Sequence, residues 1–112
     1  MTDLGKKCWT LQVAVKGDTS LAGARKVVDD IIAAIGMTPI FKPTAYQYES
    51  DIGIIYIQPI YESFVAYDAW PCHGGGYITI TSCREFQPDQ AIEVMVGYGF
   101  MVGESNFVVI SL

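Results

Sequence analysis

Ser63–Cys83, SFVAYDAWPCHGGGYITITSC, joins two strand-like runs through a short segment rich in proline and glycine. The first run is SFVAYDAW and the second is GGYITITSC, and both contain the β-branched and aromatic residues that favour strands. Pro71-Cys72-His73-Gly74-Gly75 between them carries the turn-forming residues of a tight connection. The stretch therefore predicts two neighbouring strands of one sheet.

The flanking sequence adds strands and two helices around this pair. CWTLQVAVK (8–16) alternates apolar and polar residues and predicts a strand. Apolar residues then recur at helical spacing up to Gly36, which predicts a helix over about 20–35. TPIFKPTAYQY (38–48) predicts an edge strand, because proline cannot donate to a ladder. DIGIIYIQPIY (51–61) predicts a buried strand interrupted at Pro59.

After Cys83 the chain predicts one more helix and one more strand. Gln87-Pro88-Asp89 has the proline of a helix start, and Gly97 or Gly99 ends that helix. NFVVISL (106–112) predicts the last strand. The order β-α-β-β-β-β-α-β indicates an α+β two-layer sandwich, a mostly antiparallel sheet with two helices on one face. We interpret residues 1–112 as a single domain whose other sheet face is covered by a second subunit.

Composition excludes several classes of function. The chain has 112 residues, 51% of them hydrophobic, and a net charge of −5 that argues against nucleic acid and weakly favours a cationic small molecule. Three widely spaced cysteines and a single histidine give no disulfide framework and no metal site. With neither a membrane span nor a signal-peptide pattern in the sequence, we expect a cytoplasmic protein with reduced thiols.

Taken one at a time, the reactive side chains of this region carry little information. A Glu-Ser pair such as Glu62-Ser63 is usually a solvated turn, and Cys83 at a strand end is usually a small buried side chain. Gly74-Gly75-Gly76 lacks the following helix that a phosphate-binding loop requires.

The combination is more specific than its parts. Glu62-Ser63, Trp70-Pro71 and Cys83 keep the spacing of a motif in the prokaryotic S-adenosylmethionine decarboxylases, and the chain resembles that family over most of its length. The resemblance implies that Ser63 attacks the carbonyl before it and that the chain cleaves itself into a β chain, 1–62, and an α chain, 63–112. The α chain would begin with a pyruvoyl group that forms a Schiff base with the substrate amine, with no external cofactor and no metal. Cys83 matches the family's proton donor.

Three positions depart from the family pattern. Asp68 stands where the family has the histidine that assists self-processing, and a carboxylate can act as the base instead. Cys72 stands where the family has the glutamate that holds the ribose, and a thiol cannot bind two hydroxyls as a carboxylate does. A gapless count places Glu49 where the family has the aromatic that stacks on adenine.

These departures indicate a changed substrate on a retained electron sink. We therefore favour a decarboxylase of polyamine biosynthesis acting on L-ornithine or L-arginine, with Asp68 and Glu49 facing the distal cation. S-adenosylmethionine is the alternative substrate, because the Trp70 face can hold a sulfonium. A homologue that no longer cleaves itself and acts as a binding or partner subunit is the alternative outside enzymes. The resemblance also implies a homodimer of processed protomers.

Overall fold

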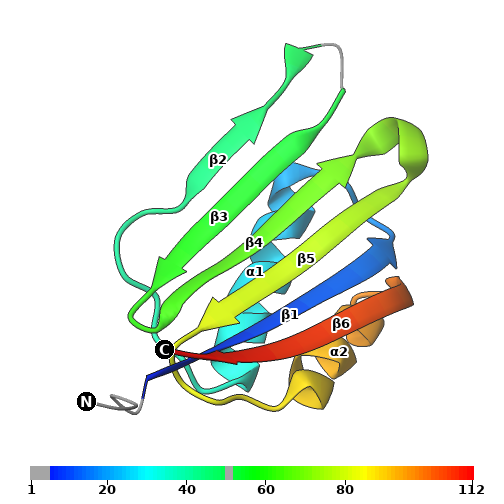
Figure 1. Ribbon diagram of the computed structural model, residues 1–112. Coiled ribbons are helices and arrows are strands. Elements are labelled where there is room, and N and C mark those ends of the chain that lie inside the picture. The colour runs from blue at the N-terminus through cyan, green and yellow to red at the C-terminus, as the bar shows by residue number, and fades with distance from the viewer. Residues whose placement is uncertain (1–5, 50–51) are drawn as a thin grey trace.

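The computed structural model describes residues 6–49 and 52–112. Residues 1–5 belong to the N-terminal stretch in which the sequence shows no signal-peptide pattern, and they lie outside the described residues. Six strands and two helices follow one another in the predicted order (Figure 1). The elements are β1 (Lys7–Lys16), α1 (Leu21–Ala34), β2 (Thr44–Gln47), β3 (Ile54–Ile60), β4 (Ser63–Trp70), β5 (Gly75–Ser82), α2 (Pro88–Gly97) and β6 (Met101–Ser111), with a short 3-10 turn, η2 (Pro71–His73), between β4 and β5.

The strands form one sheet in the order β2-β3-β4-β5-β1-β6, and each neighbouring pair is antiparallel. Both helices lie behind this sheet in Figure 1, so one face of the sheet is covered and the other is open. The predicted α+β sandwich with two helices on one face is confirmed.

The core lies between the helices and the covered face of the sheet. Strand alternation sends every second residue of β1, β4 and β5 to that face, where they are buried. The largest fully buried side chains are Tyr67, Leu11, Ile31, Ile54, Ile60, Ile78, Ile80 and Met95. Truncating one such aliphatic side chain to alanine typically costs about 2–5 kcal/mol, so this layer holds the fold together.

Helix α1 begins and ends where the sequence predicts. The Ser20 side chain caps it by accepting a hydrogen bond from the Gly23 N–H at 3.0 Å. Gly36, just past the end, has a φ of +72°, a conformation that glycine adopts without steric cost. Helix α2 has Pro88 in its first turn and is followed by Gly99 with a φ of +86°, so the predicted start and end of this helix are confirmed.

The predicted interruption of β3 at Pro59 is wrong. Pro59 pairs with Phe64 of β4 inside a continuous strand. The ladder between β2 and β3 involves only residues 54–57 of β3, so Pro59 lies beyond β2 and needs no N–H on that side. Its carbonyl accepts a hydrogen bond from the Ile40 N–H at 3.0 Å, which continues the sheet edge past the proline.

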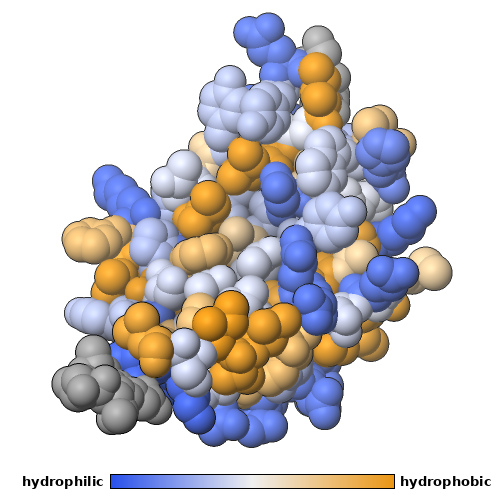
Figure 2. Space-filling model, in the orientation of Figure 1, coloured by the Kyte–Doolittle hydropathy of each residue, from blue (hydrophilic) through white to orange (hydrophobic). Residues whose placement is uncertain are grey.

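The open face carries apolar side chains that are well exposed in one protomer. Figure 2, which views this face, shows apolar patches among polar side chains. Strand register places Tyr77 and Ile110 on it, 45% and 62% exposed, with the partly buried Phe64. Apolar area of this kind favours contact with another surface. Among the described residues, no helix is long and apolar enough to cross a membrane.

Candidate active site

The predicted cleavage bond lies in the tight turn between β3 and β4. Tyr61 and Glu62 form the turn, and Ile60 pairs with Ser63 across it. Ser63 is the first residue of β4, is exposed, and pairs on its other side with Ser82 at the end of β5. The bond between Glu62 and Ser63 is therefore accessible at one end of the sheet, while the strands on both sides fix its position.

The carbonyl group of this bond is engaged by the residue predicted to be the proton donor. The backbone N–H of Cys83 donates a hydrogen bond to the Glu62 carbonyl oxygen at 2.9 Å. A donor at this position fixes the plane of the peptide group and stabilises negative charge on the oxygen when a nucleophile adds to the carbonyl carbon. Cys83 itself is exposed and its thiol is free.

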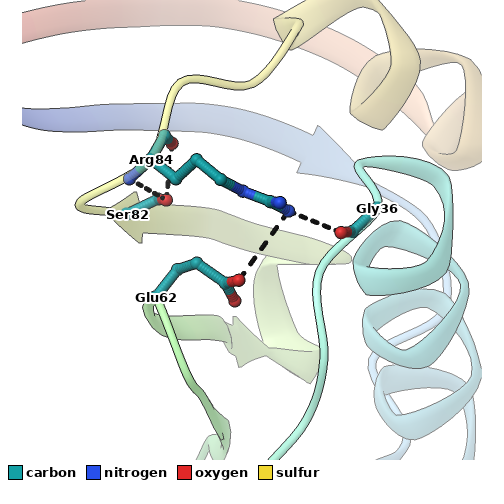
Figure 3. Close-up of polar contacts among 4 residues, drawn as sticks. All are labelled: Gly36, Glu62, Ser82 and Arg84. Carbon is teal, nitrogen blue, oxygen red and sulfur yellow. Dashed lines mark hydrogen bonds and ion pairs between the residues drawn. The ribbon is translucent and has the colours of Figure 1, made fainter.

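The Glu62 side chain is largely buried beside a cation. Its side chain is only 16% exposed, and its Oε2 lies 3.7 Å from Nη2 of Arg84 (Figure 3). The same Nη2 donates a hydrogen bond to the Gly36 carbonyl at the end of α1. Glu62 Oε1 is buried without a hydrogen-bond partner. Arg84 thus connects the turn that contains the cleavage bond to the end of a helix.

Ser82 fixes the backbone of Arg84. Its hydroxyl accepts a hydrogen bond from the Arg84 N–H at 2.9 Å and donates one to the Arg84 carbonyl at 2.6 Å. Ser82 is one of the two buried polar residues of the described part of the chain. Sequence reasoning missed both Ser82 and Arg84, although the strand register opposite Ser63 would have pointed to position 82.

Asp68 and Trp70 lie at the other end of the sheet. Asp68 pairs with Tyr77, and the ring of Tyr77 meets that of Trp70 edge-on, with centroids 5.8 Å apart. Asp68 is exposed, yet the surrounding protein removes part of its water, and this partial burial raises the pKa of its carboxyl above the usual value. A raised pKa moves a carboxylate towards the range useful for proton transfer.

A groove of about 580 Å³ opens beside Trp70 and Tyr77. Lys16 and His73 also line it, and two glycines form part of its wall. At Gly75 and Gly76 an added Cβ would overlap the carbonyl oxygens of Val15 and Asp68, so the wall is built by close backbone approach. The groove is large enough for an amino acid or a nucleoside.

The remaining predicted residues are exposed at this same end. Cys72 lies in η2, which follows Trp70 directly, and its thiol is free. Glu49 lies in the connection between β2 and β3, where neighbouring Gly53 approaches Trp70 and Tyr48. Neither residue lines the groove. Across residues 6–49 and 52–112, no three acidic, cysteine or histidine side chains gather as a metal site.

The structure therefore separates the predicted site into two halves. Glu62, Ser63 and Cys83 meet at one end of β4 and β5, and Asp68 and Trp70 lie at the opposite end. Asp68 is five residues along β4 from Ser63, about 17 Å at about 3.3 Å per residue. An odd separation also puts the two side chains on opposite faces of the strand. Within one protomer Asp68 cannot contact Ser63.

The chain is similar to known proteins at the level of a family. No curated protein matches the sequence significantly. A sequence model of a family described as S-adenosylmethionine decarboxylase matches residues 18–104, which includes both halves of the site. The chain therefore belongs to the S-adenosylmethionine decarboxylase family, a family of pyruvoyl-dependent decarboxylases.

Proposed function

We propose that the chain cleaves itself between Glu62 and Ser63 and then works as a decarboxylase. The Ser63 Oγ attacks the Glu62 carbonyl carbon, the C–N bond breaks, and an ester with a free amine results. A base removes the Ser63 Cα proton, the Cβ–Oγ bond breaks, and Glu62 leaves as a carboxylate. The remaining enamine becomes an imine, and water releases ammonia to give a pyruvoyl group on residues 63–112.

One observation carries this proposal. The Cys83 N–H donates to the carbonyl oxygen that must bear negative charge when Ser63 attacks. Ser63 is exposed at the first position of its strand, so a ketone formed there would face solvent and substrate. The site fits a pyruvoyl group, whose carbonyl would accept the electrons released as carbon dioxide leaves. The free Cys83 thiol is the proton donor that we assign to the product carbon.

The processing base comes from a second copy of the chain. Asp68 lies about 17 Å along β4 from Ser63 of its own protomer, beyond the reach of proton transfer. A homodimer that stacks two open faces about a two-fold axis perpendicular to the strands places opposite strand ends over each other. Asp68 of one protomer then lies over the Ser63 end of the other protomer, on the face opposite to the Ser63 side chain, where it would approach the Ser63 Cα proton that the base must remove. Burial in that interface would raise the pKa of Asp68 further.

The groove at the Trp70 end supports a cationic substrate. The Trp70 and Tyr77 rings offer aromatic faces to the groove. Asp68 lies outside the groove lining but pairs with Tyr77, and its carboxylate offsets the positive charge of Lys16, which lines the groove. We favour L-ornithine or L-arginine, which would place the chain in polyamine biosynthesis. S-adenosylmethionine remains the second substrate, because its sulfonium suits the same faces. Three free cysteines suit a reducing cytoplasm.

The experiment is carbon dioxide release from L-ornithine, L-arginine and S-adenosylmethionine, measured in parallel with purified protein. We expect one of the first two to give the highest kcat/KM and the Ser63→Ala variant to be inactive with all three. Cys83→Ala should still cleave, because alanine keeps the backbone N–H that contacts Glu62, but should turn over poorly. Cleaved protein that is inactive on all three substrates would contradict the assignment of substrate class.

A further inference from the structure

Arg84 occupies a position that the decarboxylase chemistry leaves without a role. It follows Cys83 directly, yet its side chain reaches back to Glu62 on one side and to the end of α1 on the other (Figure 3). Cys83 and Arg84, which are consecutive in the sequence, therefore both contact Glu62. The Cys83 N–H holds the Glu62 carbonyl, and the Arg84 guanidinium holds the Glu62 carboxylate.

The burial of Glu62 makes this contact more than a surface ion pair. Its side chain is 16% exposed, and one of its oxygens is buried without a hydrogen-bond partner. A carboxylate removed from water needs a nearby cation, and a cation on one side alone draws it in that direction. Arg84 is therefore what fixes the direction in which the Glu62 side chain points.

Arg84 is itself fixed both at its backbone and at its guanidinium. Ser82 makes two hydrogen bonds to its backbone, and the Gly36 carbonyl accepts from its Nη2. A cation is favourable next to the carbonyls at a helix C-terminus. The end of α1, the end of β5 and the turn before β4 are thereby joined through one side chain.

We propose that Arg84 is a positioning residue for self-cleavage, and this inference rests on the proposed function. By fixing the Glu62 side chain it limits rotation of the Glu62 carbonyl about the backbone, so that the carbonyl carbon stays in front of the Ser63 hydroxyl. Intramolecular attack depends steeply on such alignment. After the cut, Glu62 ends its chain with two carboxylates, and the same guanidinium holds that new end in place.

The test compares cleavage rates of freshly purified precursors by intact mass for the wild type, Arg84→Ala and Arg84→Lys. We expect Arg84→Ala to slow cleavage roughly ten- to a hundredfold, because small misplacements of reacting groups have effects of that order. Arg84→Lys keeps the charge and should recover part of the rate. Arg25→Ala is the matched control, because it removes an exposed arginine that is ion-paired with Asp29 on α1, and it should cleave at the wild-type rate.

A second pair of variants shows whether Arg84 acts through Glu62. In a Glu62→Gln background, Arg84→Ala should slow cleavage little further, since the carboxylate it holds is gone. Unfolding of Ser63→Ala precursors with and without Arg84→Ala identifies a variant that merely fails to fold. Equal slowing in both backgrounds would overturn the proposal. Cleavage of Arg84→Ala at the wild-type rate would also overturn the role of Arg84, but it would leave the proposed function standing. A wild-type chain that never cleaves would overturn both the role of Arg84 and the proposed function.

Discussion

The two ends of the sheet differ in how they are fixed to α1. At the Ser63 end the link is polar and partly exposed, because Arg84 reaches the Gly36 carbonyl past the end of the helix. At the Trp70 end the link is made by a buried core side chain. The Tyr67 hydroxyl donates a hydrogen bond to the Asp18 carbonyl, just before the helix, at 2.9 Å. Burial, and to a lesser degree the nearby Asp18 carboxylate, raises the pKa of Tyr67 to about 12.

This difference matches the two tasks that we assign to the ends. The Ser63 end must break a backbone bond, and its link to α1 is a polar contact beside the apolar core, so the break leaves that core intact. The Trp70 end must present a shaped groove, and it is built from close glycine contacts and a packed phenol that allow little movement. The largest effects on cleavage are therefore expected from the residues that bring the two ends together, and the largest effects on stability from the Trp70 end.

The largest effect is expected for Asp68→Asn, which removes the base that we place at the far end. Alone, this variant should cleave at least about a hundredfold more slowly, the usual effect of losing a general base. Co-expressed with a Ser63→Ala chain, it should regain cleavage, because the Cα proton of its intact Ser63 then lies next to the Asp68 of the other chain. An Asp68→Asn chain that stays whole in the mixture would contradict the contribution from a second copy.

The backbone donor at the Ser63 end is tested by a matched pair at position 83. Cys83→Pro removes the N–H that contacts the Glu62 carbonyl and should slow cleavage about 10²–10³-fold, as loss of one oxyanion donor does. Cys83→Ala keeps that N–H and should cleave normally. Intact-mass time courses measure both rates, and circular dichroism checks that the proline variant folds. Equal cleavage rates for the two variants would contradict a role of the Cys83 N–H in cleavage.

The tight packing at the Trp70 end is tested by Gly76→Ala. The new Cβ would overlap the Asp68 carbonyl oxygen, so strands β4 and β5 must separate, and the free energy of unfolding should fall by about 1–3 kcal/mol. Gly97→Ala, at the end of α2, meets nothing within 4 Å and should be neutral or stabilising by up to about 1 kcal/mol. Denaturant unfolding of Ser63→Ala precursors gives both values, and a Gly76→Ala chain as stable as its parent would contradict the close approach.

Tyr67→Phe should have a smaller effect at the same end. It removes the hydrogen bond to Asp18 but keeps the ring, which packs edge-on against Phe100 with centroids 5.7 Å apart. We expect a loss of about 1 kcal/mol in the free energy of unfolding, the usual net value of one hydrogen bond. A loss of less than a few tenths would mean that this contact does not anchor the start of α1.

The smallest effect is a pH dependence at Asp18. The Ser20 hydroxyl and the Ser20 N–H donate to this carboxylate and lower its pKa below the usual 3.8. The resulting stability is present above pH 3.8 and lost as the pH falls through the lower folded-state pKa. Because the site is exposed and screened, we expect about 0.5 kcal/mol or less, seen as a shallower acid dependence of unfolding in Asp18→Asn.

Most of the fold could be predicted from the sequence because its signals are local. Alternation and runs of β-branched or aromatic residues predicted the strands, and Gly36 and Pro88 marked helix ends. The prediction for Pro59 failed because the extent of the neighbouring strand decides whether a proline interrupts a ladder, and no local pattern shows that β2 begins only at Thr44, which pairs with Ile57.

The site was less predictable because its contacts join residues that are far apart in the sequence. The contact of Arg84 with Gly36 joins residues 48 apart in the sequence, and nothing near Arg84 announces it. The separation of Asp68 from Ser63, in contrast, follows from strand geometry alone, because five residues along one strand change both the position and the face. The sequence thus contained the signal that Asp68 and Ser63 of one protomer lie apart.

The intact mass of the purified wild-type chain tests self-cleavage directly. We expect two fragments divided between Glu62 and Ser63, the second with a blocked amino terminus that gains mass on borohydride reduction with substrate. Ser63→Ala should remain a single full-length chain. A wild-type protein that stays whole on prolonged incubation, at a concentration where it is dimeric, would contradict the claim.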